Sequence, residues 1–288
     1  MSAPTRVLVL GITGMLGNAM FRLLSEDPRL EVRGGARSTA AASRFAEPLR
    51  ARIFGGFDGE SADRLAELFA THRPEVVVNC VGLVKQLANA NRVLDAIPIN
   101  TLLPHRLLQL CTAGGARLVH ISTDCVFSGK EGDYRESDQP DATDLYGLSK
   151  LLGEVAAPNA ITLRTSIIGH ELDSANGLLG WFLSQPGPVR GFRRAIFSGL
   201  PTVELARIVR EHVLPRPELH GLYHVSADAI AKYDLLHLFA AAYGRDIEIA
   251  PDDSLVIDRS LNSDRFRDAT GYAPPSWPEL VATMHAFG

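Results

Sequence analysis

The chain has 288 residues, of which 46% are hydrophobic and 22% are charged. This composition is ordinary for a folded globular protein and excludes an intrinsically disordered chain. A formal net charge of -4 gives no reason to expect a nucleic acid or an anionic membrane as partner. The longest apolar stretch, residues 7–17, is too short to span a bilayer and is interrupted by glycines, so we expect a cytoplasmic protein.

Three cysteines, Cys80, Cys111 and Cys125, are odd in number and irregularly spaced. They predict neither a disulfide framework nor a zinc site, and the scattered histidines show no metal-ligand spacing. No residue is therefore predicted to be a metal ligand.

Apolar strands alternate with helical patterns from the N-terminus onward. Residues 6–10 predict a buried strand, 15–24 a helix, and 30–33, 51–54, 75–80 and 117–121 further strands. Strands without a polar face indicate a parallel sheet covered on both sides. The prediction is an α/β fold with a doubly wound parallel sheet of the Rossmann type over residues 1–166.

The pattern loosens after about residue 166, where glycine and proline become frequent. Strand-like segments at 160–164 and 221–226 flank a predicted helix at 202–212. We therefore predict that residues 197–225 return to the Rossmann domain. Residues 167–196 and 226–288 are expected to form a smaller, interleaved substrate-binding region.

A glycine-rich turn follows the first strand and opens the first helix, with the spacing G-x-x-G-x-x-G. Glycine lets the backbone approach a pyrophosphate, and the helix N-terminus offers free N–H groups and a partial positive charge. A simple turn is the alternative for such a motif. The residues predicted to contact a dinucleotide here are Gly11, Thr13, Gly14, Met15, Leu16 and Gly17.

Tyr146 and Lys150 are spaced i and i+4, so a helix places phenol and ammonium on one face. A nearby cation is expected to lower the pKa of the phenol, which makes Tyr146 a candidate proton donor to a carbonyl oxygen. An amphipathic surface helix is the competing interpretation. Thr123 follows a predicted strand, at the edge of the sheet where ligands bind in open α/β folds.

Three segments, residues 122–127, 146–150 and 163–166, resemble those of dTDP-4-dehydrorhamnose reductases and related nucleotide-sugar 4-ketoreductases. These belong to the extended short-chain dehydrogenases/reductases, whose glycine spacing the chain also resembles. The similarity continues through 201–206 and 221–225 and covers almost the whole chain. It implies that Thr123, Tyr146 and Lys150 form the catalytic trio and that Asn100 is the asparagine of the preceding helix.

The cofactor is expected to be NADPH, with NADH possible. After the second strand the chain carries Arg37 and Ser38 and no carboxylate, which suits a 2′-phosphate, although Arg37 could also be an ordinary surface residue. Asp58 resembles the family's adenine-contacting aspartate, with a turn-forming role as the alternative. The remaining predicted cofactor contacts are Cys80, Val81, Gly82 and Asn100, together with Tyr146 and Lys150.

The predicted substrate pocket departs from the reductases that the chain resembles. Cys125 stands where they usually carry tyrosine, and Ile167 where they usually carry tryptophan. Arg190 and Phe192 belong to a basic stretch that suits a nucleotide diphosphate, or else forms an exposed loop. The candidate substrate contacts are Lys85, Thr123, Asp124, Cys125, Ser166, Arg190 and Phe192.

The resemblance implies an NADPH-dependent reductase of the 4-keto group of a dTDP- or UDP-linked deoxysugar, serving cell-surface polysaccharide precursor synthesis. Two alternatives stay open. One is a nucleotide-sugar epimerase or dehydratase that holds NAD tightly. The other is a regulatory partner like the β-subunit of methionine adenosyltransferase. The expected partner is a nucleotide sugar, and a homodimer is implied by the resemblance alone.

Overall fold

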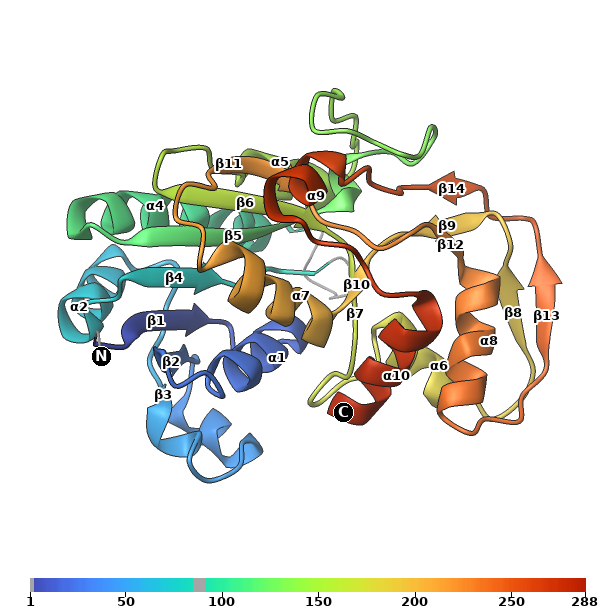
Figure 1. Cartoon of the computed structure of the whole chain (residues 1–288), viewed down its shortest axis with the longest axis horizontal. Coiled ribbons are helices and arrows are strands. Elements are labelled where there is room, and N and C mark those ends of the chain that lie inside the picture. The colour runs from blue at the N-terminus through green and yellow to red at the C-terminus, as the bar shows by residue number, and fades with distance from the viewer. Residues whose placement is uncertain (1–2, 85–91) are drawn as a thin grey trace.

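A parallel sheet forms the core of the larger, left-hand part of the protein in Figure 1. The computed structural model describes residues 3–84 and 92–288. Seven strands pair in the order β11-β6-β5-β4-β1-β2-β3, and every pairing is parallel. Their bounds are β1 (Thr5–Leu10), β2 (Leu30–Gly35), β3 (Ile53–Phe54), β4 (Val76–Asn79), β5 (Arg117–Thr123), β6 (Ala160–Thr165) and β11 (Gly221–His224).

Both faces of the sheet are buried because the strands carry apolar side chains at successive positions. Val7 and Val9 of β1 belong to one core cluster, and Leu8 and Leu10 belong to another. The helices that cover the sheet and the C-terminal region are α1 (Met15–Leu24), α2 (Ala62–His72), α3 (Val93–Ala96), α4 (Leu103–Gly114), α5 (Leu145–Leu152), α6 (Leu178–Leu183), α7 (Thr202–Ile208), α8 (Lys232–Ala242), α9 (Asp264–Thr270) and α10 (Trp277–Phe287). Buried side chains of α1 and α7 belong to the first cluster, and those of α2 and α4 to the second. The predicted doubly wound fold is confirmed.

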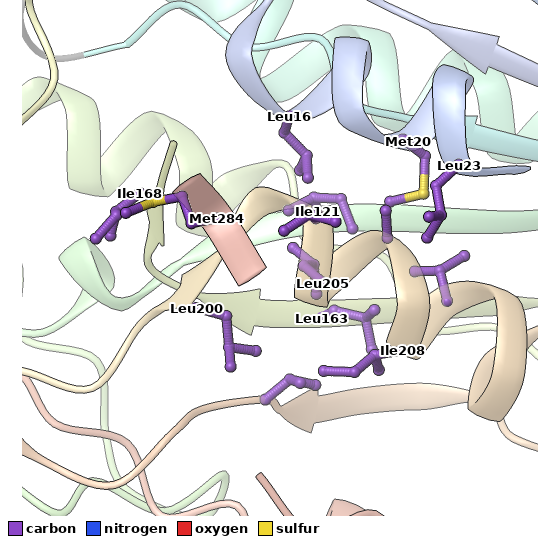
Figure 2. Packing of buried hydrophobic residues seen from close by; sticks show 14 of the residues in the cluster. Leu16, Met20, Leu23, Ile121, Leu163, Ile168, Leu200, Leu205, Ile208 and Met284 are labelled. Carbon is purple, nitrogen blue, oxygen red and sulfur yellow. The ribbon is translucent and has the colours of Figure 1, made fainter. Parts of the chain in front are cut away.

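Helix α1 packs against α7 and the underlying strands (Figure 2). Leu16, Met20 and Leu23 lie on one face of α1 because they are spaced four and three residues apart. Leu205 and Ile208 of α7 belong to the same buried cluster. This packing holds α1 against the sheet, so its N-terminus is fixed at the carboxyl end of β1.

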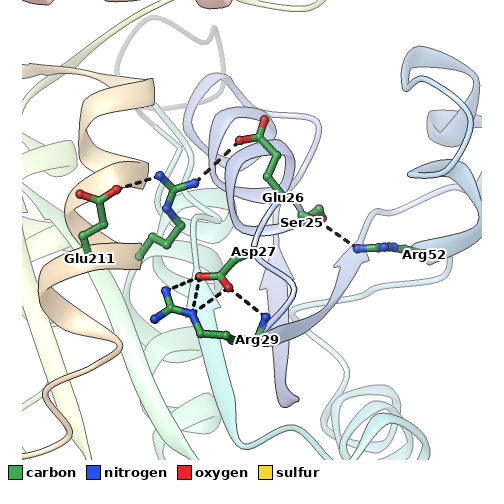
Figure 3. A network of polar contacts seen from close by, with 7 residues as sticks. Ser25, Glu26, Asp27, Arg29, Arg52 and Glu211 are labelled. Atoms are coloured by element: carbon green, nitrogen blue, oxygen red, sulfur yellow. Dashed lines mark hydrogen bonds and ion pairs between the residues drawn. The ribbon is translucent and has the colours of Figure 1, made fainter. Parts of the chain in front are cut away.

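Polar contacts secure the other end of α1 (Figure 3). Asp27 accepts hydrogen bonds from both the backbone and the guanidinium of Arg29, which hold the pKa of the carboxyl below its usual range. Glu26 lies 3.8 Å from Arg210, in the π-helical segment Val209–Val213 that continues α7. One partner of each pair is exposed to solvent, and ion pairs at the surface contribute only roughly 0.2–1 kcal/mol. The apolar contact between the helices therefore stabilises their packing most.

Three small sheets form beside the central one. β7 (Ile167–Ile168) pairs with β10 (Leu200–Pro201), and β8 (Val189–Phe192) pairs with β13 (Ile249–Asp252). β9 (Ala195–Phe197) lies between β12 (Ile230–Ala231) and β14 (Ile257–Asp258). Between these segments α7 and β11 return to the central sheet. No helix in the described ranges has both the length and the apolar character needed to cross a membrane.

Candidate active site

A cavity of about 640 Å³ opens at the carboxyl ends of β1, β4, β5 and β6. Its wall comes from three parts of the chain: the glycine turn before α1, the end of β5 with helix α5, and segments of the C-terminal region. Parallel strands bring their carboxyl ends to one edge, which is why residues far apart in the sequence meet here.

The glycine turn brings the N-terminus of α1 to the cavity. Gly11 has a φ of 84°, in the left-handed region that favours glycine. A Cβ at Gly17 would collide with the carbonyl of Gly11, so only glycine lets α1 start this close to the turn. Gly14 caps α1 without a side-chain hydrogen bond, and the first turn of the helix carries no acidic residue. The free backbone N–H groups in the first turn of α1 therefore suit a pyrophosphate.

Helix α5 is seated tightly beside the end of β5. Asp144 caps it by accepting a hydrogen bond from the backbone N–H of Gly147 at 2.8 Å. A Cβ at Gly147 would collide with the carbonyl of Cys125, and one at Gly153 would collide with the carbonyl of Asn100. The position of Tyr146 and Lys150 therefore depends on glycines that allow close backbone approach.

Tyr146 lies beside Thr123, which hydrogen-bonds its hydroxyl and also donates to a carboxylate oxygen of Asp124 at 3.1 Å. Removal from water raises the pKa of Tyr146, and the neighbouring Cys125 and Asp124 raise it further. The prediction that the phenol has a lowered pKa is therefore wrong for this structure, because burial penalises the phenolate. Tyr146 stays protonated at neutral pH, as a proton donor must.

Lys150 is buried at the back of the cavity, where its ammonium donates a hydrogen bond to the carbonyl of Ile121 at 2.8 Å. Burial lowers the pKa of Lys150 to about 8, although the carboxylate of Glu154 acts in the opposite direction. Asn100 does not line the cavity. It bonds the backbone of Leu83 through both amide atoms and donates to the hydroxyl of Ser149, which joins α5 to the loop after β4.

Most of the predicted site residues meet at this cavity. Those that line it are Thr13, Gly14, Met15, Leu16, Cys80, Val81, Gly82, Thr123, Asp124, Cys125, Tyr146, Lys150 and Ser166. Those that do not are Gly11, Gly17, Arg37, Ser38, Asp58, Asn100, Arg190 and Phe192. Lys85 lies outside the described residues.

Two predicted cofactor contacts have local structural roles. The hydroxyl of Ser38 accepts a hydrogen bond from the backbone of Ala40 and caps a short 3-10 helix. A carboxylate oxygen of Asp58 accepts one from the backbone of Glu60, which matches the turn-forming alternative. Arg37 lies exposed just beyond β2, so its contact with a 2′-phosphate stays a prediction.

The basic stretch predicted to bind a diphosphate lies on strand β8 and the turn after it. Arg190 forms an ion pair with Asp252 at 3.0 Å, and Arg193 forms one with Asp253. The pairing of β8 with β13 places Asp252 opposite Phe192, within reach of Arg190. The charges of both arginines are thus already balanced outside the cavity, which argues against the proposed contact.

Several cavity residues were not predicted. Lys232 and Arg259 bring two positive charges, Phe197 an aromatic ring and Glu171 a carboxylate. They come from β9, the start of α8 and the segments after β7 and β14. No sequence motif marks them, since only the folding of the C-terminal region carries them to the cavity.

A Rossmann sheet that presents a glycine turn, a strand-end threonine and a Tyr-x-x-x-Lys helix to one cavity defines a protein of the extended short-chain dehydrogenase/reductase type. Comparison with known proteins narrows this class. The chain belongs to the RmlD substrate binding domain family, whose sequence model matches residues 5–256. The predicted family is confirmed.

The known relatives include reductases and a subunit of a different enzyme. A dTDP-4-dehydrorhamnose reductase of Aggregatibacter actinomycetemcomitans is 24% identical over 98% of this chain and 99% of that protein. The methionine adenosyltransferase 2 subunit beta of Bos taurus is 31% identical over 83% of this chain and 72% of that protein. Among solved structures, dTDP-4-dehydrorhamnose reductase of Bacillus anthracis in complex with NADP matches with a TM-score of 0.82, at 19% identity and over 100% of both chains.

Proposed function

We propose that this protein is an NADPH-dependent reductase of the 4-keto group of a dTDP- or UDP-linked deoxysugar. It would act in the cytoplasm on precursors of cell-surface polysaccharides. The observation that carries the proposal is the convergence of Thr123, Tyr146 and Lys150 on the cavity into which the N-terminus of α1 opens. The relatives described as dTDP-4-dehydrorhamnose reductases support the same substrate class.

The residues at the glycine turn fit a dinucleotide. Gly11 and Gly17 remove the side chains that would block the approach of α1, and Gly14 leaves the helix N-terminus uncapped by a side chain. Cys80, Val81 and Gly82 continue the same wall beyond β4. When bound, NADPH supplies the hydride that the reduction of a carbonyl requires. Arg37 is the residue proposed to favour the 2′-phosphate.

The protein's own part in the reaction is to orient the carbonyl and deliver a proton. Thr123 would hydrogen-bond the substrate oxygen and keep it beside Tyr146. Tyr146 would give its phenolic proton to that oxygen as negative charge develops there. The raised pKa of Tyr146 ensures that the proton is present at neutral pH. Lys150 places a positive charge behind the site and stabilises the developing anion.

Turnover assays test this proposal. Purified protein with NADPH and a dTDP-linked 4-keto-6-deoxysugar is expected to consume NADPH, whereas an epimerase or dehydratase would show no net consumption. Tyr146→Phe is expected to lower kcat by roughly 10²- to 10⁴-fold, the usual contribution of general acid catalysis, with NADPH affinity retained. Tyr233→Phe is the control, because Tyr233 lies on α8 and does not line the cavity. Full turnover by Tyr146→Phe would contradict the assignment.

A regulatory role is a second candidate, favoured by the relative from Bos taurus that is described as a subunit of methionine adenosyltransferase. Copurification with a second enzyme, together with no turnover on any keto sugar, would support that role. The convergence of Thr123, Tyr146 and Lys150 on one cavity favours catalysis instead.

A further inference from the structure

Two cations line the cavity beside the candidate catalytic trio, in positions that the sequence does not mark. Lys232 begins α8, directly after β12, and Arg259 directly follows β14. Both strands pair with β9, and Phe197 of β9 also lines the cavity. The same small sheet thus carries both positive charges to one region of the cavity.

Arg259 is held in place by the loop that follows the trio's threonine. Its Nε donates a hydrogen bond to the carbonyl of Phe127 at 2.7 Å, and its Nη1 lies 3.9 Å from the sulfur of Cys125. Cys125 is two residues beyond Thr123 and is close enough to affect Tyr146 electrostatically. The guanidinium therefore lies on the side of the cavity where the reacting end of a substrate would sit.

Lys232 is half-buried, and its ammonium makes no hydrogen bond or ion pair with a side chain in residues 3–84 or 92–288. Burial and the neighbouring Arg259 both lower its pKa, whereas Asp124 raises it. The carboxylate of Asp124 also accepts a hydrogen bond from the hydroxyl of Thr123. Among residues 3–84 and 92–288, Asp124 is the carboxylate that acts on Lys232, and Arg259 acts on the same carboxylate. Two cations thus share one carboxylate, which leaves positive charge there that an anion would balance.

The arginines of β8 and its following turn differ in this respect. Arg190 and Arg193 each have a carboxylate partner, Asp252 and Asp253, and neither arginine lines the cavity. Lys232 and Arg259 therefore differ from Arg190 and Arg193 both in their position on the cavity and in their unbalanced charge.

We propose that Lys232 and Arg259 bind an oxyanion of the substrate, with Phe197 beside it. A diphosphate and a sugar carboxylate share the required chemistry: oxygen atoms with negative charge that accept charge-assisted hydrogen bonds. The inference rests on the proposed function only in taking the ligand to be a nucleotide sugar. It assigns the anion to residues of the C-terminal region, in place of the basic stretch around Arg190.

Calorimetric titration of the NADPH-bound protein tests the proposal without relying on turnover. The probes are dTDP, thymidine, UDP-glucose and UDP-glucuronate. Lys232→Met is the main variant, since it keeps most of the unbranched side chain and removes the ammonium with its charge and its hydrogen-bond donors. Arg259→Lys tests the second cation and retains a positive charge near the carbonyl of Phe127. Arg190→Gln is the matched control, because it removes a cation of the same region that lies outside the cavity.

For a diphosphate, Lys232→Met is expected to weaken dTDP binding about 10- to 100-fold, the usual value of a contact to a charged group, and to leave thymidine binding unchanged. For a sugar carboxylate, dTDP binding stays constant and the preference for UDP-glucuronate over UDP-glucose disappears. Either result supports the proposal. Unchanged binding of all probes in Lys232→Met, an equal loss in Arg190→Gln, or no binding of any probe to the wild type would overturn it.

NADPH consumption by the wild type, measured separately, distinguishes a failure of the anion-site proposal from a failure of the proposed function. If the protein binds dTDP through Lys232 but reduces no keto sugar, the anion site is supported and the proposed function is contradicted. If the protein reduces a keto sugar but Lys232→Met binds every probe as the wild type does, the proposed function is supported and the anion site is contradicted.

Discussion

Glu154→Gln removes the charge that balances a buried arginine behind the active site. Arg164 of β6 directs Nε and Nη2 at the two carboxylate oxygens of Glu154, each at 2.7 Å. The Arg164 side chain is 4% exposed and that of Glu154 is 12% exposed, so water cannot replace the carboxylate. Glu154 also accepts a hydrogen bond from the hydroxyl of Ser122, which lies on β5, the strand that ends at Thr123.

The expected loss of stability follows from this burial. Removing one partner of a buried ion pair costs about 3–5 kcal/mol, because the other charge is left uncompensated. Glutamine keeps one acceptor oxygen for Arg164, which places the expected loss near the lower end, about 3 kcal/mol. That is about a 140-fold change in the unfolding equilibrium.

Equilibrium urea unfolding, followed by circular dichroism, measures this loss. Glu67→Gln is the control, because Glu67 pairs with Arg64 at 2.9 Å on the surface, where both side chains are mostly exposed. That variant should lose no more than about 0.5 kcal/mol. A loss below about 1 kcal/mol for Glu154→Gln, or equal losses in the two variants, would refute the reasoning that burial increases the contribution of the Glu154–Arg164 ion pair to the free energy of unfolding.

Three further predictions follow from the site. Activity should fall as the pH rises through about 8, where Lys150 loses its charge; a kcat/KM profile that stays flat well above that pH would contradict the role of the ammonium. Gly17→Ala should force α1 away from the carbonyl of Gly11, weaken NADPH binding and cost about 1–3 kcal/mol of stability, whereas Gly114→Ala, with open space around it, should do neither. Arg37→Ala should weaken NADPH binding more than NADH binding, and equal changes measured by cofactor titration would remove Arg37 from the phosphate site.

Local sequence patterns were sufficient for the central sheet, but they did not predict the three small sheets beside it. The alternation of apolar strands and helices predicted the parallel sheet, and the helix at 15–24 was predicted with the bounds that α1 has. Periodicity succeeds here because burial on both faces of the sheet leaves a continuous apolar signal in each strand. The resemblance to reductases supplied Thr123, Tyr146 and Lys150, whose convergence the cavity displays.

What the chain alone determined is the order of its elements and the glycine and Tyr-x-x-x-Lys motifs, since each depends on neighbouring residues. Only the tertiary structure decided the charges and contacts of the cavity. It paired Arg190 with Asp252, brought Lys232 and Arg259 beside Asp124, and raised the pKa of Tyr146 where proximity to Lys150 predicted the reverse. Electrostatic environment depends on burial and on partners distant in the sequence, and local spacing carries neither.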